Sequence, residues 1–261
     1  MRKTIAASLL CLCIAVSLAA AAAAQGLAGV GIVLMHGKTG MPAGPIEGLA
    51  AALRKDGAVV VTPEMPWSRT RIYDASYEQA LADIGRAVAD LRKRGLTRIV
   101  VAGQSIGANA AIAYGVRHDD IAGIIAIAPG HNPAAPSFLK HTEASLEKAR
   151  KAVSAGQGDA KAAYVDFNQG RVFEVRASAK VYLSYLDPDG PANMARNARS
   201  MKPVPFLLAI GRDDPLYPMA RQIVYEPAAK SPKSKFVDVA GGHKDTMRIA
   251  AGAIAGWLKS L

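Results

Sequence analysis

Cysteine is almost absent from this chain of 261 residues. The two cysteines, Cys11 and Cys13, both lie within the first 24 residues. The rest of the sequence can therefore form neither a disulfide framework nor a thiol nucleophile. We expect this part of the protein to depend on its hydrophobic core for stability.

The chain also lacks the histidine and cysteine spacings that are typical of metal sites. Its five histidines are dispersed, and no two of them are four residues apart. Metal sites need such ligands to converge on one ion. The sequence therefore predicts no metal site, and no motif calls for a cofactor.

Basic residues outnumber acidic ones, but they form no continuous run. The chain has 32 Lys and Arg against 21 Asp and Glu, a net charge of +11. No basic stretch with interleaved aromatic residues is present, although that is the pattern of a nucleic-acid-binding surface. We expect solvated surface charge and no nucleic-acid partner, with weak attraction to an anionic lipid or cell-wall surface as the alternative.

The first 24 residues differ from the rest of the sequence. A short basic start, Arg2 and Lys3, precedes an uncharged apolar stretch over residues 4–20, and the small residues 22–24 follow. This is the pattern of a secretory signal peptide, which we expect to be cut after Ala24. The alternative is an uncleaved membrane anchor. With cleavage, the sequence predicts a secreted or periplasmic protein without stable membrane insertion and one domain over residues 25–261.

Short apolar runs alternate with helix-like segments along residues 25–261. Continuous apolar strands separated by helices are typical of parallel β-α-β units, so the expected class is α/β with about six strands. The ligand site of such a sheet lies at the carboxyl ends of its strands. The expected strands cover residues 30–35, 58–62, 98–102, 121–128, 204–210 and 235–239.

An insertion interrupts this alternation from about residue 131 to residue 202. It contains no convincing buried strand, and residues 137–155 and part of 160–186 have helical patterns. Because it leaves from the carboxyl end of a strand, we expect a helical cap over the site. It is too short and too polar to form a separate domain.

The segment Gly103-Gln104-Ser105-Ile106-Gly107 carries the strongest functional signal. It has the form G-x-S-x-G and lies between a predicted strand and a helix of small residues, which is the context of a nucleophile elbow. The strained turn of such an elbow exposes the serine hydroxyl, and the glycines permit the close packing around it. The pattern alone also arises by chance in a chain with 24 glycines.

With three further motifs in the expected order, residues 29–261 resemble the α/β-hydrolase superfamily. These are His36-Gly37 after an early strand, Asp213-Asp214 after a late one, and Gly242-His243 after the last. The order Ser, Asp, His is that of the superfamily. The antiparallel strands that often begin its sheet are missing here, so we expect a reduced version of the fold.

The resemblance implies a catalytic role for three residues. Ser105 would be the nucleophile, His243 the general base, and Asp214 the acid that orients the imidazole. Asp214 matches the superfamily's G-x-x-D pattern after Gly211, and Asp213 is the alternative acid. His131, which ends a predicted strand, is the rival base.

The resemblance also implies an oxyanion hole made of two backbone N–H groups, those of Lys38 and Ile106.

One loop of the sequence could border the pocket and contact substrate. There Trp67 is either a pocket wall or core packing, and Arg69 and Arg71 either bind an anionic group of the substrate or are solvated.

The resulting prediction is a serine hydrolase acting on a small or medium carboxylic ester or thioester through an acyl-enzyme, without a cofactor. A peptidase or acyltransferase with the same triad is the first alternative. A non-catalytic binding domain of the same fold is the second. The sequence predicts no oligomeric state.

Overall fold

The computed structural model describes residues 26–261, so the predicted signal peptide, residues 1–24, lies outside the described residues. Within residues 26–261, no helix combines the length and the apolarity needed to cross a bilayer. The elements are, in chain order, β1 (Val30–Met35), α2 (Glu47–Lys55), β2 (Val59–Val61), α3 (Tyr77–Lys93), β3 (Arg98–Gln104), α4 (Ile106–Arg117), β4 (Gly123–Ile127), α5 (Pro136–Ser154), β5 (Lys161–Asn168), β6 (Arg171–Ser178), α6 (Ala179–Leu186), α7 (Met194–Arg199), β7 (Phe206–Gly211), α8 (Tyr217–Met219), the π-helical turn η1 (Ala220–Tyr225), β8 (Lys235–Val239), α9 (Thr246–Ile249) and α10 (Ala251–Lys259).

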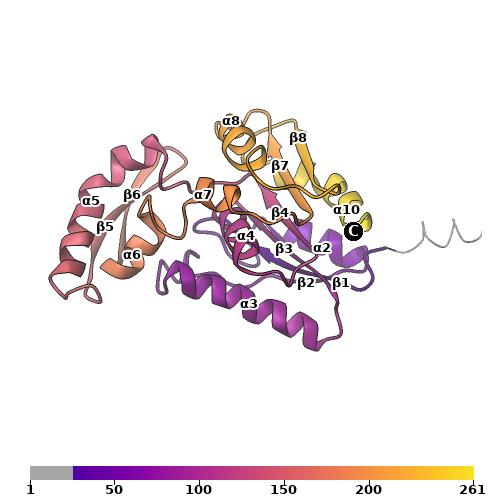
Figure 1. Cartoon of the computed structure of the whole chain (residues 1–261), viewed down its shortest axis with the longest axis horizontal. Helices are drawn as coiled ribbons and strands as arrows, with labels where there is room; N and C mark the ends of the chain where they lie inside the picture. Colours follow the sequence, from indigo (N-terminus) through magenta and orange to yellow (C-terminus); the bar gives the residue numbers. More distant parts are fainter. Residues whose placement is uncertain (1–25) are drawn as a thin grey trace, which may run out of the picture.

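Six strands form the central sheet in the order β2-β1-β3-β4-β7-β8, and every pairing is parallel. Figure 1 shows this sheet between helices, with α3 on one side and α2 and α10 on the other. The α/β class and the six strands expected from the sequence are confirmed, and within residues 26–261 no antiparallel strand precedes β1 in this sheet.

Alternating residues of each strand supply two separate cores, one on each face of the sheet. In β1, Val33 and Met35 join the core beneath α3 and α4. Their neighbours Ile32 and Leu34 join the core beneath α2 and α10. Successive side chains of a strand point to opposite faces, so both faces of this parallel sheet are buried.

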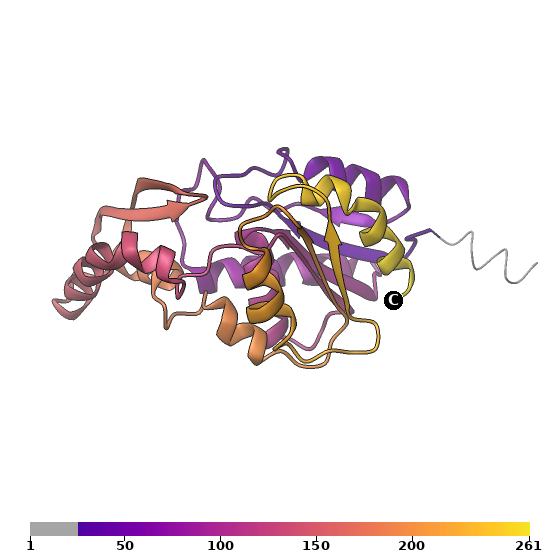
Figure 2. The ribbon, with the colours of Figure 1, turned by 90° about the horizontal axis from the view of Figure 1, so that it is seen from above.

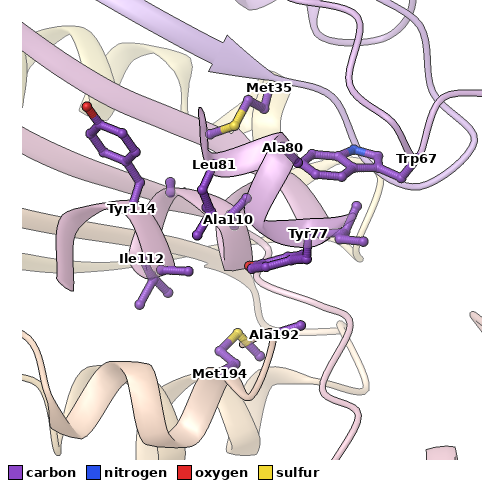
Figure 3. Packing of buried hydrophobic residues seen from close by; sticks show 14 of the residues in the cluster. Met35, Trp67, Tyr77, Ala80, Leu81, Ala110, Ile112, Tyr114, Ala192 and Met194 are labelled. Carbon is purple, nitrogen blue, oxygen red and sulfur yellow. The ribbon is translucent and has the colours of Figure 1, made fainter. Parts of the chain in front are cut away.

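Small residues let α4 pack tightly against the sheet and α3. Ten consecutive residues of α4, 106–115, are buried. Figure 3 shows Ala110 of this helix next to Leu81 and Tyr77 of α3. The Tyr77 hydroxyl donates a hydrogen bond to Asn109 Oδ1 at 2.7 Å, so the two helices are also joined by a polar contact.

The insertion forms a lobe beside the sheet, made of α5, β5, β6 and α6, with α7 leading back to the core (Figures 1 and 2). The prediction of a helical cap without strands was wrong in one respect, because β5 and β6 form an antiparallel hairpin. One face of the hairpin is exposed and carries charged residues, so it shows no continuous apolar run. Its two-residue turn, Gln169-Gly170, has positive φ at both residues, as in a type I′ turn.

Candidate active site

Ser105 lies at the turn between β3 and α4, in a strained conformation. Its φ of 59° and ψ of −118° fall outside the helix and strand regions. Its backbone N–H donates to the Ile127 carbonyl oxygen at 3.0 Å, and its carbonyl oxygen accepts from Gly130 N at 3.2 Å. Contacts with the end of β4 and the loop after it therefore hold the residue in a conformation that a non-glycine residue rarely adopts.

The glycines of the elbow permit a close approach of backbones. A Cβ atom at Gly103 would lie 2.3 Å from the Gly107 carbonyl, and one at Gly107 would lie 2.7 Å from the Met35 carbonyl oxygen. A Cβ at Gly130 would lie 2.8 Å from Ser105 Oγ. Any larger residue at these three positions would displace the turn or cover the hydroxyl.

His243 and Asp214 come together from the loops after the last two strands. His243 Nδ1 donates to Asp214 Oδ2 at 2.7 Å. The other oxygen, Asp214 Oδ1, accepts from Leu216 N at 2.9 Å, and the residue is only 3% exposed. The neighbouring Asp213 is exposed, and within residues 26–261 no hydrogen bond joins it to His243.

The second nitrogen of His243 is free to accept a proton. Nε2 is buried and has no hydrogen-bond partner among the described residues. Since Nδ1 carries the proton shared with Asp214, Nε2 presents its lone pair. His243 and Ser105 line the same cavity, but no direct hydrogen bond joins them in the part of the chain described here. Such bonds are often long in unliganded enzymes and shorten when substrate binds.

The loop after β1 lies against the elbow. A Cβ at Gly37 would lie 3.3 Å from Ser105 Cβ. Among residues 26–261, the backbone N–H groups of Lys38 and Ile106 donate to no protein acceptor. His36 holds the loop, because its Nδ1 donates to the Gly37 carbonyl at 2.8 Å and its Nε2 accepts from Met65 N at 3.1 Å. Burial lowers the pKa of His36, which keeps the ring neutral in this role.

None of Trp67, Arg69 and Arg71 lines the cavity that contains Ser105, so the substrate contacts suggested for this loop are not seen. Trp67 is buried in the core and donates from Nε1 to the His36 carbonyl at 2.9 Å. Arg71 binds Asp74, and Arg69 is exposed to solvent. The loop therefore supports the segment before Lys38 instead of contacting the cavity.

The sequence analysis missed a buried ion pair that joins the loop after β1 to the cap. Lys38 Nζ lies 2.8 Å from both carboxylate oxygens of Asp166 on β5, and the two side chains are 3% and 0% exposed. The Tyr73 hydroxyl donates to the same carboxylate at 2.8 Å. Burial lowers the pKa of Lys38, and the adjacent carboxylate opposes this shift. No local signal could reveal the pair, because its members are 128 positions apart.

Core and cap border a cavity of about 630 Å³ that contains Ser105. Apolar side chains from both parts form much of its wall, and Asp214 is the only acidic residue among its lining residues. Within residues 26–261, no three His, Cys, Asp or Glu side chains are grouped so that they could hold a metal ion. The lining residues are Ser105, Gly130, His131, Asn132, Ala135, Ser137, Phe138, Phe167, Asn168, Gln169, Gly170, Asp214, Pro215, Leu216, Met219 and His243.

His131, the rival base, has no carboxylate partner among the described residues. Its Nε2 lies 2.9 Å from the Tyr185 carbonyl oxygen, and its Nδ1 is buried without a partner. The geometry of an acid-oriented imidazole is therefore found at His243 and not at His131.

Comparisons with known proteins agree with this architecture. A family model described as serine aminopeptidase, S33, matches residues 31–253. No curated protein matches the chain. A structure from work on the metagenome-derived lipolytic enzymes LipS and LipT has a TM-score of 0.64 at 16% identity, covering 90% of this chain and 95% of that chain.

Two further solved structures have the same fold. The monoacylglycerol lipase of Paleococcus ferrophilus has a TM-score of 0.63 at 20% identity, covering 88% of this chain and 94% of that chain. The siderophore hydrolase EstB from Aspergillus fumigatus has a TM-score of 0.57 at 14% identity, covering 89% and 91%. At such low identities these likenesses show the fold alone.

Proposed function

Because the chain belongs to the serine aminopeptidase S33 family of α/β-hydrolases, we propose that it cleaves a small or medium-sized carboxylic ester through an acyl-enzyme intermediate. One observation carries the proposal. The His243 imidazole is held by Asp214 at 2.7 Å, its Nε2 has no partner among the described residues, and His243 lines the cavity that contains the strained Ser105. A nucleophile, a base and an orienting acid are the parts that acyl transfer needs.

The first half of the reaction forms the acyl-enzyme. Ser105 Oγ attacks the ester carbon while its proton passes to His243 Nε2, and Asp214 stabilises the imidazolium. The negative charge on the carbonyl oxygen is held by the N–H groups of Lys38 and Ile106, each worth about 3–4 kcal/mol of transition-state stabilisation. The tetrahedral intermediate then collapses, and the alcohol leaves with the proton from His243.

The second half releases the acid. Water attacks the acyl carbon and gives a proton to His243, and the collapse of the second tetrahedral intermediate returns that proton to Ser105 Oγ. A thioester would follow the same route with a thiol as leaving group. No step requires a group other than the chain, the substrate and water.

The proposal is tested with a series of p-nitrophenyl esters and two serine variants. Ser105→Ala removes the nucleophile, so we expect activity to fall by at least about 10³-fold. Ser137→Ala is the matched control, because Ser137 lines the same cavity but belongs to helix α5 and not to the elbow. Equal activity in Ser105→Ala and the parent protein would contradict the proposal.

The family description favours an aminopeptidase as the second candidate. Such an enzyme must bind the ammonium group of its substrate, and an unpaired carboxylate is the usual partner for a buried cation. Among residues 26–261, Asp214 is the only acid that lines the cavity, and it is already bonded to His243. This supports the ester over the peptide. Faster cleavage of alanine p-nitroanilide than of any ester would reverse the choice.

One reagent distinguishes a non-catalytic binding domain from an esterase and from an aminopeptidase. A fluorophosphonate labels a serine that a neighbouring base activates, so the proposal expects labelling at Ser105 and none in Ser105→Ala. An unlabelled protein that also cleaves no ester would favour the binding domain.

The proposed place of action is outside the cytoplasm, because residues 1–24 have the pattern of a signal peptide. The mature protein would then begin at Gln25. N-terminal sequencing of the protein from a periplasmic or culture fraction tests this, and a chain that still begins at Met1 would favour the uncleaved anchor.

A further inference from the structure

Three buried side-chain atoms lack a hydrogen-bond partner in the part of the chain that the structure describes, and all three belong to residues lining the Ser105 cavity. They are His243 Nε2, His131 Nδ1 and Asn132 Oδ1. The proposed base accounts for the first. The other two are unexplained, although a buried polar atom without a partner costs about 1–3 kcal/mol. Each of these two acceptors on adjacent residues needs a further partner, which a substrate in the cavity can supply.

The chemistry of His131 identifies Nδ1 as an acceptor. Its Nε2 lies 2.9 Å from the Tyr185 carbonyl oxygen, which can only accept, so Nε2 carries the proton. Burial, assisted by the charge of Lys38, lowers the pKa of His131 to about 3, so the ring is neutral at physiological pH. A neutral imidazole protonated at Nε2 presents a bare lone pair at Nδ1.

The surroundings hold His131 and Asn132 in place. His131 is 6% and Asn132 is 8% exposed, and the Phe138 ring packs edge-on against the His131 ring at 5.3 Å. His131 has a φ of 62°, and its carbonyl oxygen accepts from Asn109 Nδ2 at 2.6 Å. A strained residue that a buried hydrogen bond retains is typical of a ligand site.

The charge of the cavity limits what these acceptors can bind. The only acidic side chain among the lining residues is Asp214, and its carboxylate is bonded to His243 and to Leu216 N. Two neutral acceptors without an unpaired carboxylate suit a neutral donor, because a cation would be buried without a counter-ion.

Building on the proposed ester hydrolysis, we propose that His131 Nδ1 and Asn132 Oδ1 form a subsite for a neutral hydrogen-bond donor of the substrate. The donor is a hydroxyl or an amide N–H close to the scissile ester. The preferred substrates are then esters that carry such a group, and plain hydrocarbon esters are poorer substrates.

Matched substrate pairs test this in the unmodified protein. p-Nitrophenyl 3-hydroxybutyrate and p-nitrophenyl N-acetylglycinate are each compared with p-nitrophenyl butyrate, and 2-hydroxyethyl butyrate is compared with ethyl butyrate. We expect kcat/KM to be about 5-fold to 150-fold higher for the donor-bearing member of at least one pair, the ratio that about 1–3 kcal/mol produces. The pair that responds shows whether the donor is a hydroxyl or an amide and whether it lies on the acyl or the alcohol side.

Variants then assign the preference to the subsite. Asn132→Leu keeps a side chain of similar size without an acceptor, so kcat/KM for the donor-bearing ester should fall more than kcat/KM for the plain ester, and the ratio of the two should approach one. Asn168→Leu is the matched control, since Asn168 lines the same cavity but is partly exposed. A merely structural role of Asn132 would lower both rates equally and leave the ratio unchanged.

The possible failures are distinguishable. Hydrolysis of all esters without any preference for a donor would overturn the subsite and leave the proposed function intact. Failure to cleave any ester, plain or donor-bearing, together with no fluorophosphonate labelling, would overturn both.

Discussion

At the scale of single residues, Asp213 and Asp214 differ in burial and in the hydrogen bonds of their carboxylates. Asp214 is buried and bonded to His243 Nδ1, whereas Asp213 is exposed. In Asp214→Asn the amide no longer fixes the productive tautomer of His243, so we expect kcat/KM to fall by about 10⁴-fold. Asp213→Asn is the control and should stay within about twofold of the parent. Steady-state kinetics with one p-nitrophenyl ester measures both, and an equal loss in the two variants would contradict the assignment.

A second prediction at the scale of residues concerns His131 and the dependence of the free energy of unfolding on pH. Its pKa is lowered to about 3 in the folded protein, whereas an unfolded histidine titrates near 6.5. Below about pH 6.5 the unfolded chain therefore binds a proton that the folded state does not. The free energy of unfolding should decrease by about 1.4 kcal/mol per pH unit between about pH 6 and pH 4 from this residue alone.

Urea denaturation at several pH values measures this slope. His131→Gln cannot titrate, so its slope should be shallower by that amount, while His118→Gln, at an exposed histidine, should keep the slope of the parent. A parent and a His131→Gln variant with the same slope would show that His131 does not titrate in this way.

At the scale of elements, the cap hairpin is fastened to the loop after β1 by the buried pair of Lys38 and Asp166. Asp166→Asn leaves the Lys38 ammonium buried without its counter-charge, so we expect a loss of about 3–5 kcal/mol in the free energy of unfolding. The double variant Lys38→Met/Asp166→Leu removes both charges and should recover most of that loss.

An exposed ion pair serves as the control for this prediction. Lys202 and Asp119 are both more than half exposed, so Asp119→Asn should cost less than about 1 kcal/mol. Urea denaturation compares the three variants. Equal losses in Asp166→Asn and Asp119→Asn would show that the cap does not depend on the buried pair.

At the scale of the whole molecule, the sheet and the cap together limit the size of a substrate. The cavity between them holds about 630 Å³, and each buried methylene contributes about 0.8 kcal/mol until the space is filled. We therefore expect kcat/KM to rise with acyl length from acetate to a medium chain and then to fall toward palmitate. Ala135→Phe adds a ring to the cavity wall and reduces the cavity volume, so the highest kcat/KM should move to a shorter acyl chain. Undiminished activity on palmitate would show that the cavity volume does not limit the acyl chain.

The sequence alone was sufficient for the central sheet and for the order of the motifs. Strands buried on both faces need continuous apolar runs, and helices need apolar residues at intervals of three or four, so β1, β3 and α3 were visible as patterns. The elbow at Ser105 was visible because close backbone packing requires glycines at fixed positions around it. Each of these features depends on residues that are close together in the sequence, so the sequence alone is enough to predict it.

The tertiary structure decided what depends on residues that are distant in the chain. The choice of Asp214 over Asp213 rests on which carboxylate faces His243, and the pairing of Lys38 with Asp166 joins positions 128 residues apart. The sequence left Trp67, Arg69 and Arg71 open between substrate contact and core packing or solvation, because a loop pattern does not reveal which side chains it buries. The unpaired acceptors of His131 and Asn132 arise because folding buries these atoms, and no residue in the described part of the chain bonds to them. Sequence patterns reflect the conformational preferences of neighbouring residues. Burial and pairing between residues that are distant in the chain depend on the folded structure.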